Sequence, residues 1–168
     1  MDTARRRFLT STTKLAVAAG LASIVPVPLL AASKRKNVSA GDTINIALIG
    51  CRSMGIGDLL NAIKQPGVTC TALCDVDRNI LDERTADVLK KQGKAPKKYS
   101  DYRKLLEDKD VDAVIIGTPD HWHCLPFVAA CEAGKDVYVE KPLANSITEC
   151  DIMMRATRKY NRVVQVGM

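Results

Sequence analysis

Aromatic residues are scarce in this chain of 168 residues, at 4%, and only one of them is a tryptophan. The 25 basic residues are dispersed along the chain. The first 33 positions contain four basic residues and one acidic residue. This surplus of three positive charges is half of the net charge of +6. A nucleic-acid-binding protein typically presents stacking rings or a basic stripe. Neither pattern is visible, so no nucleic-acid partner is expected.

The chain also lacks a Cys-x-x-Cys pair and any tight group of histidines and cysteines, so no metal site is expected. A chain that folds in the cytoplasm forms no disulfides while it folds. The cysteines are therefore predicted to be small buried residues: Cys51, Cys70, Cys74, Cys124, Cys131 and Cys150. Cys51 is the exception, because it lies in a glycine-containing turn where we expect ligand contact.

No hydrophobic run is long enough to cross a bilayer comfortably, which takes about 20 residues. The mildly apolar residues 15–25 follow the twin-arginine sequence RRRFL at positions 5–9 and precede small residues at 31–33. This order is typical of a Tat signal peptide, read by the Tat export machinery. We predict a signal at 1–33, a polar linker at 34–42, and a periplasmic or other extracytoplasmic location. A disordered basic tail and an uncleaved membrane anchor are the alternatives.

Residues 43–57 (TINIALIGCRSMGIG) are the most informative stretch. The apolar run at 44–49 is typical of a strand buried on both faces of a parallel sheet. A turn from Gly50 to Gly55 follows, and then a predicted helix at 58–64. Backbone N–H groups and the positive end of the helix dipole converge at such a turn, which therefore predicts a phosphate-binding site.

The turn matches two of the three glycines of the dinucleotide-binding pattern G-x-G-x-x-G. Gly50 and Gly55 fill the first and third positions, and Arg52 stands at the second. Either the Arg52 side chain swings away, for example onto a phosphate, or cofactor binding is weakened. An ordinary strand-to-helix turn is the alternative for this stretch alone.

A second predicted strand, residues 68–74, ends at Asp75, which lies about 20–25 residues beyond the turn, where an acidic side chain can bind an adenosine ribose. An aspartate there favours NAD, because it repels a 2′-phosphate. Arg78 is near enough to keep NADP as the alternative cofactor. The other interpretation of Asp75 is a helix N-cap.

The remaining pattern predicts an α/β domain over residues 43–168, a Rossmann-type parallel sheet with helices on both faces. We expect further strands at 111–117, 137–139 and 163–166, which makes five in all. We expect helices at 78–92 with Gly93 as its stop, at 101–106 with Asp101 as its cap, at 126–133, and at 146–159 with Ser146 and Glu149 as a capping box. Residues 94–100 are predicted to be a basic loop.

Two polar turns follow predicted strands, at the edge of an open α/β sheet where ligands bind. Residues 118–123 (TPDHWH) place His121 and His123 around the tryptophan, with helix capping and packing as the alternative role. Residues 140–142 (EKP) place Lys141 before a proline, which restricts the backbone and holds the lysine in one direction. Lys141 can donate to a substrate oxygen or to a nicotinamide ribose.

Together these segments, with CDVD at 74–77, EKPL at 140–143 and the closing VVQVGM, resemble the Gfo/Idh/MocA oxidoreductases over residues 43–168. The resemblance implies NAD(P) binding and hydride transfer on a sugar, polyol or derivative. The turn would hold the pyrophosphate (Gly50, Cys51, Arg52, Ser53, Met54 and Gly55) and Asp75 the ribose. Thr118, Pro119 and His123 would line the nicotinamide side. The EKP turn would supply Glu140 and the catalytic Lys141, with His123 as a second catalytic candidate.

The resemblance also implies a C-terminal antiparallel-sheet domain, which binds substrate, carries an Asp and a His as acid/base partners, and supplies the oligomer interface. That domain is absent from these 168 residues. We therefore expect weak NAD(H) binding and no sugar turnover by this chain alone. Two other functions stay open: part of an NAD-dependent glycosidase or lyase with no net redox, and a non-catalytic nucleotide-binding module.

Overall fold

The computed structural model describes residues 43–168, so the predicted signal and linker lie outside the described part. The strands are β1 (Ile44–Ile49), β2 (Val68–Cys74), β3 (Lys97–Tyr99), β4 (Ala113–Ile116), β5 (Asp136–Val139) and β6 (Val164–Val166). The helices are α2 (Ser53–Ala62), α3 (Arg78–Gln92), α4 (Tyr102–Leu106), α5 (Cys124–Glu132) and α6 (Ile147–Tyr160), with a 3₁₀ turn η1 (Asp120–Trp122).

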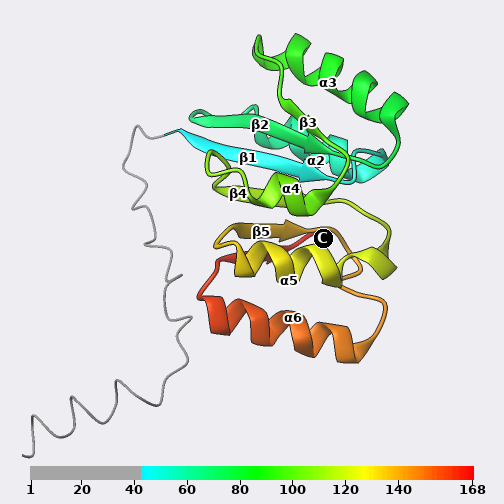
Figure 1. The fold of residues 1–168 in the computed structure, drawn as a ribbon, viewed down its shortest axis with the longest axis vertical. Coiled ribbons are helices and arrows are strands. Elements are labelled where there is room, and N and C mark those ends of the chain that lie inside the picture. The colour runs from blue at the N-terminus through cyan, green and yellow to red at the C-terminus, as the bar shows by residue number, and fades with distance from the viewer. Residues whose placement is uncertain (1–42) are drawn as a thin grey trace, which may run out of the picture. The chain divides into compact units, whose positions relative to one another are not determined.

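All six strands are parallel and lie in the order β3-β2-β1-β4-β5-β6, which confirms the predicted fold class (Figure 1). The chain first winds outward from β1 to β3 and then returns to the other side of β1 with β4. The order thus reverses between β1 and β4. In a doubly wound sheet, ligands bind beyond the carboxyl ends of the strands at this reversal.

Helices cover both faces of the sheet because successive side chains of a buried strand point to opposite sides. Leu48 packs in the core cluster beneath α2 and α3, whereas its neighbour Ile49 packs in the cluster beneath α4, α5 and α6. In Figure 1 the helices α4 and α5 lie in front of the strands, and α6 lies next to α5. Leu48 is fully buried and Ile49 is 3% exposed, so the centre of the sheet is closed to water.

Several helix ends follow the predicted chemistry. Gly93 ends α3 in the left-handed conformation, with φ of +76°. The Asp101 carboxylate accepts the N–H of Arg103 at the start of α4. The Ser146 hydroxyl accepts the N–H of Glu149 at the start of α6. These caps satisfy N–H groups that the first turn of a helix leaves without partners.

Two boundaries differ from the prediction. Residues 97–99, predicted as loop, form the edge strand β3, which pairs with β2 through Ala72 and Lys97. An edge strand needs backbone pairing on one side only, so it does not require an apolar sequence. The two lysines and the nearby proline therefore gave no strand pattern in the sequence. The helix predicted at 58–64 instead begins at Ser53, so Gly55 and Gly57 lie inside it.

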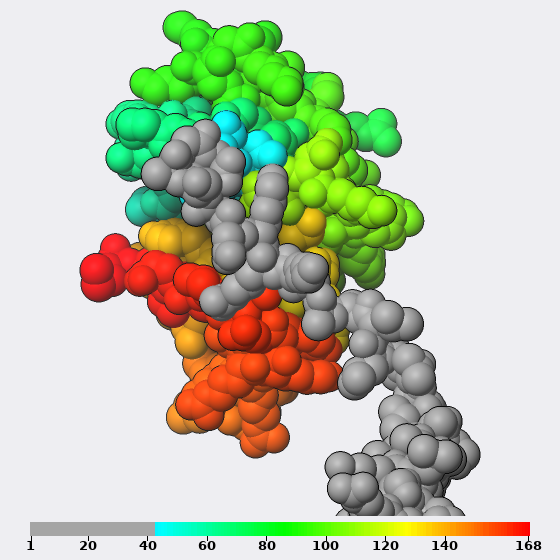
Figure 2. Space-filling model, turned by 90° about the vertical axis from the view of Figure 1, so that its left-hand side faces the viewer, coloured from blue at the N-terminus to red at the C-terminus, as the bar shows by residue number. Residues whose placement is uncertain are grey.

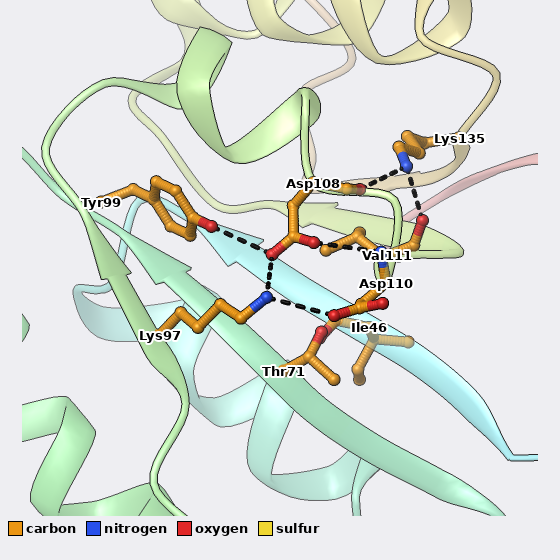
Figure 3. A network of polar contacts seen from close by, with 8 residues as sticks. All are labelled: Ile46, Thr71, Lys97, Tyr99, Asp108, Asp110, Val111 and Lys135. Carbon is orange, nitrogen blue, oxygen red and sulfur yellow. Dashed lines mark hydrogen bonds and ion pairs between the residues drawn. The ribbon is translucent and has the colours of Figure 1, made fainter.

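A polar network ties β3 to the turn before β4 (Figure 3). The Lys97 ammonium donates to Asp108 at 2.8 Å and to Asp110 at 3.2 Å, and the Tyr99 hydroxyl donates to Asp108 at 3.0 Å. The Lys135 ammonium donates to two backbone carbonyls of the same turn, Asp108 O at 2.8 Å and Val111 O at 2.7 Å. Lys135 is 8% exposed, and burial lowers its pKa.

Replacing Lys135 with methionine is expected to lower the free energy of unfolding by about 2 kcal/mol, because two buried carbonyls lose their charged donor. Methionine keeps most of the aliphatic volume, so the loss reports the hydrogen bonds. Urea unfolding followed by circular dichroism measures it. Lys159→Met is the matched control, since Lys159 lies over the Tyr160 ring at the end of α6, where its ammonium is not buried. Equal stability of the two variants would contradict a stabilising role for the hydrogen bonds of the Lys135 ammonium.

Among the strands of residues 43–168, β6 lies at the sheet edge and pairs with β5 alone. In Figure 2 the residues that end the chain (red) lie at the surface beside β5. On the α2 side of the sheet, Tyr138 of β5 lies opposite Gln165 of β6, and Gln165 is exposed. Within residues 43–168, no helix combines the length and the hydrophobicity that a membrane span requires.

Candidate functional site

Three glycines pack backbone against backbone where β1 and β4 end. A Cβ on Gly50 would lie 2.7 Å from Thr118 N, and Gly50 has φ of +87°. A Cβ on Gly55 would lie 2.5 Å from Gly50 O, and one on Gly117 would lie 2.5 Å from Gly55 Cα. Real Cβ contacts are never this short, so all three positions require glycine. The sequence pattern identified Gly50 and Gly55 but missed Gly117, which follows a buried strand.

The first turn of α2 contains Gly55, so this helix begins at the glycine contact. Arg52 is the N-cap residue but makes no side-chain cap, and the first turn carries no acidic residue. Ser53 has φ of +39°, which is uncommon for a residue with a side chain. A ten-residue helix with an uncapped start attracts an anion through its N–H groups and its dipole.

The Arg52 side chain turns outward, to the loop between β2 and α3. Its guanidinium pairs with Asp77 and is 61% exposed. The other Asp77 oxygen accepts the N–H groups of Asn79 and Ile80, so Asp77 caps α3. Arg52 stands at the second glycine position of the pattern, where we expected either a side chain turned away or weakened cofactor binding. The side chain is turned away, and it pairs with the Asp77 carboxylate.

Asp75 braces the glycine turn from the end of β2. One carboxylate oxygen accepts the N–H of Cys51 at 2.8 Å, and the other accepts the N–H of Asp77 at 2.9 Å. The alternative role as a helix cap is wrong, because Asp77 caps the following helix. Each oxygen keeps a further lone pair, so Asp75 can still accept from a ligand hydroxyl.

Cys51 does not face the cleft with its side chain, in contrast to the expectation. Its thiol is fully buried and donates to Cys74 O at 3.4 Å. Burial and the neighbouring Asp75 carboxylate raise its pKa far above that of a free thiol. All six cysteines are free thiols. Over residues 43–168, no three histidine, cysteine, aspartate or glutamate side chains gather in a way that could hold a metal ion.

His123 is buried rather than facing the cleft, which differs from the expected contact with the nicotinamide side. Its Nδ1 lies 2.9 Å from Pro142 O and its Nε2 lies 2.7 Å from Thr118 O. The ring is 1% exposed and joins the loop after β4 to the EKP turn. The preceding His121 is exposed and lines the cleft instead. Sequence alone favoured His123, because burial is not visible in a loop motif.

Lys141 and Glu140 lie at the end of β5. Lys141 is exposed and lines the cleft, whereas Glu140 is 6% exposed and accepts the Lys141 N–H at 3.2 Å. The Glu140 N–H donates to Ile116 O, which anchors the turn to β4. The Lys141–Pro142 peptide bond is cis. Lys141 therefore lines the cleft directly after a residue whose backbone is hydrogen-bonded to β4.

These groups line one cleft of about 1010 Å³ along the carboxyl ends of the strands. Its lining from β1, β2 and the glycine turn includes Gly50, Arg52, Ser53, Met54 and Asp75. From β4 and β5 it includes Gly117, Thr118, Pro119, Glu140 and Lys141. Gly55 supports the floor without lining the cleft. The Thr118 hydroxyl is buried and has no hydrogen-bond partner among residues 43–168. The cleft is large enough for an elongated ligand of dinucleotide size.

A model of the Gfo/Idh/MocA oxidoreductase family, NAD-binding Rossmann fold, matches residues 44–168. A glycosyl hydrolase family 109 protein of Shewanella pealeana is 32% identical over 160 residues, which span 87% of this chain and 35% of the relative. Among solved structures, an NAD binding oxidoreductase from Klebsiella pneumoniae is 34% identical with a TM-score of 0.64, over 74% of this chain and 34% of that one.

A scyllo-inositol dehydrogenase from Lactobacillus casei, solved with bound NAD(H) and scyllo-inositol, is 25% identical with a TM-score of 0.67. The match covers 75% of this chain and 36% of that protein. The chain thus spans about a third of the length of the proteins it matches. Because the family model covers almost every described residue, the chain belongs to the Gfo/Idh/MocA oxidoreductases and has the fold of their NAD-binding Rossmann domain.

Proposed function

We propose that this chain is the coenzyme-binding part of an exported oxidoreductase that transfers a hydride between NAD and a sugar, a polyol or a derivative. The observation that carries the proposal is the single cleft that joins the glycine contact, Asp75 and Lys141. A bound nicotinamide supplies the hydride acceptor or donor. The residues of this chain bind it, orient it and keep water from its reactive face.

The residues fit a dinucleotide along the length of the cleft. The pyrophosphate would lie against the Gly50 turn and the start of α2, where the close glycine packing admits it and the uncapped N–H groups attract it. Asp75 would accept the adenosine ribose hydroxyls. The Thr118 hydroxyl, which is buried and has no partner within the described part of the chain, would meet the nicotinamide end and gain a hydrogen bond there.

Lys141 would act at the nicotinamide end. Its ammonium is the charged donor that the EKP turn presents to the cleft, where it would contact the coenzyme ribose and the oxygen of the reacting carbon. His123 would act through the backbone, because its ring holds Thr118 and Pro142 in place. The Asp and His partners of the lysine, the substrate pocket and the oligomer interface would belong to a further domain.

Export is part of the proposal and rests on residues 1–33. The twin-arginine motif and the small residues at 31–33 favour the Tat route, which carries folded proteins. That route suits a protein that acquires its nucleotide in the cytoplasm. The product would lie outside the cytoplasmic membrane, free or held by an uncleaved signal. N-terminal sequencing of the exported protein tests this part.

A second candidate is a glycosidase that oxidises its sugar transiently and regenerates NAD. The curated relative of family 109 favours it, because it is 32% identical to this chain. Both functions need the same coenzyme-binding half, so the cleft supports them equally. Product analysis of a longer relative separates them: a cleaved glycoside without net NADH marks the glycosidase. A nucleotide-binding module without catalysis would bind coenzyme and lack both activities.

We expect the 168-residue chain to bind NADH with a Kd about tenfold or more below that for NADPH, because the Asp75 carboxylate opposes a 2′-phosphate. Nicotinamide fluorescence and calorimetry measure both constants, and thermal stability should rise with NADH concentration. Mixing with NAD and sugars or polyols should produce no NADH. Absence of NADH binding at saturating concentration would overturn the proposed function. Sugar-dependent NADH formation would overturn the need for a further domain.

A further inference from the structure

Two carboxyl groups lie close together at the edge of the cleft, Asp58 from α2 and Glu140, which lines the cleft at the end of β5. The Asp58 carboxyl lines a small cavity together with Tyr138, the residue whose hydroxyl reaches Glu140, and it lies close enough to Glu140 for a hydrogen bond. Its Oδ2 is buried and receives no hydrogen bond from any N–H or O–H group of residues 43–168. Glu140 Oε1 accepts the Tyr138 hydroxyl at 3.4 Å, and Oε2 accepts the Lys141 N–H at 3.2 Å. The orphaned Asp58 oxygen and the Glu140 carboxyl are thus both acceptors.

Neither group can move away easily. Asp58 lies within α2, between the buried Ile56 and Leu59. Behind Glu140, the backbone of Gly167 is so close that a Cβ there would lie 2.5 Å from Glu140 Oε1. Two fixed carboxylates at hydrogen-bonding distance repel each other, and neither can donate a hydrogen bond. A single proton between them removes the repulsion and supplies the missing donor.

Charge and burial agree with this arrangement. Burial, and then the hydrogen bond and the charge of Glu140, raise the pKa of Asp58 to about 6. Glu140 is the only charged group of residues 43–168 that acts on Asp58, and Tyr138 is the other titratable group that faces the pair. The pKa of Tyr138 is itself raised by its burial and by the two carboxyl groups. No cation of these elements balances the two charges, so below about pH 6 a proton on the pair is what removes the repulsion.

We propose that a proton shared by Asp58 and Glu140 holds α2 to the EKP turn, which makes Asp58 a positioning residue for Lys141. The proposal rests on the proposed coenzyme role of the cleft. Asp58 does not line that cleft, but α2 begins at the pyrophosphate turn and Glu140 directly precedes Lys141. The shared hydrogen bond would thus fix the distance between the pyrophosphate turn and Lys141, the two parts of the cleft proposed to bind the coenzyme.

The proton makes this link dependent on pH. The pKa of Asp58 is raised in the folded protein, so the stabilisation is complete below the unfolded value near 4 and disappears as pH rises through about 6. Above that pH the two carboxylates repel, and the turn that carries Lys141 is released from α2. NADH affinity is expected to fall by about two- to tenfold between pH 5 and 7.5, the range for losing one partly exposed hydrogen bond.

Asp58→Asn in the 168-residue chain tests the role of the proton. The amide has the shape of the carboxyl and carries its own N–H donor, so the link to Glu140 should persist without a shared proton. NADH titrations at pH 5 and 7.5 should show a flat profile for this variant and a falling one for the natural chain. Asp151→Asn is the control, because it removes an exposed carboxylate that pairs with Arg155 on α6. A profile unchanged by Asp58→Asn would overturn the proposal.

Carbon-13 NMR of the carboxyl groups gives a readout that needs no coenzyme. Asp58 should titrate near pH 6 in the natural chain and at a lower pH when Glu140 is replaced by glutamine, because burial then raises its pKa without the hydrogen bond and charge of Glu140. Titration of Asp58 near pH 4 in both chains would overturn the shared proton, even if NADH binds. If Asp58 titrates near pH 6 while NADH fails to bind, the proton link stands and the proposed function of the cleft fails.

Discussion

Gly117→Ala is expected to remove measurable NADH binding and to lower the free energy of unfolding by about 3 kcal/mol. The added Cβ would lie 2.5 Å from Gly55 Cα and 3.1 Å from both Gly50 O and Gly55 N. These are backbone atoms of the strand-to-helix turn, so no side chain can rotate to make room. The turn must move away from β4. The N–H groups at the start of α2 would then no longer be placed to bind the same phosphate.

The matched control is Gly57→Ala. It adds the same methyl group to α2, two residues after the Gly55 that Gly117 contacts. A Cβ on Gly57 meets nothing within 4 Å. Alanine is favoured over glycine inside a helix by about 1 kcal/mol, so this variant should be slightly more stable and bind NADH normally. Urea unfolding and NADH fluorescence measure both variants. If Gly117→Ala binds NADH like Gly57→Ala, the glycine contact does not shape the site.

Asp75→Ala is expected to weaken NADH binding by about 100-fold, because the same carboxylate both braces the turn and would bind the ribose. Its loss leaves the N–H groups of Cys51 and Asp77 without their acceptor. A hydrogen bond to a charged group contributes about 1.5–3 kcal/mol, so the loss of the bond to the ribose alone corresponds to about 10- to 150-fold in affinity. Selectivity against NADPH should fall as well, since the charge that opposes the 2′-phosphate is gone.

Calorimetric titration of NADH and NADPH into Asp75→Ala and Asp82→Ala separates the site from general charge effects. Asp82 is an exposed carboxylate on α3 that pairs with Lys98, so its removal should leave both affinities unchanged. A surface ion pair of this kind contributes about 1 kcal/mol at most to stability. Equal coenzyme affinities for the two variants would contradict the role of Asp75.

The sequence predicted the features that depend on neighbouring residues. Buried strands such as 44–49 appear as continuous apolar runs, and helix ends appear through local chemistry, as at Gly93 and Ser146. The glycine turn and Asp75 were predicted for the same reason, because the spacing from a strand end is a local property. These signals were sufficient to identify the fold class and one wall of the cleft.

The features that the sequence missed depend on residues brought together by the sheet. Gly117 is critical only because β4 lies beside β1, which places it against Gly55. The Asp58–Glu140 contact joins positions far apart in the chain, and nothing local to either residue indicates it. His123 was expected in the cleft, but a motif does not tell which side of a loop is buried.

The buried thiols give the domain an internal reporter of its own opening. Five of the six cysteines are buried, and burial raises their pKa, so few of these sulfur atoms are thiolates at neutral pH. Alkylating reagents attack thiolates and need access to them. Modification of these five sites therefore follows the rates at which three parts of the domain open, namely the turn after β1, strand β2 and helix α5, without any label being added.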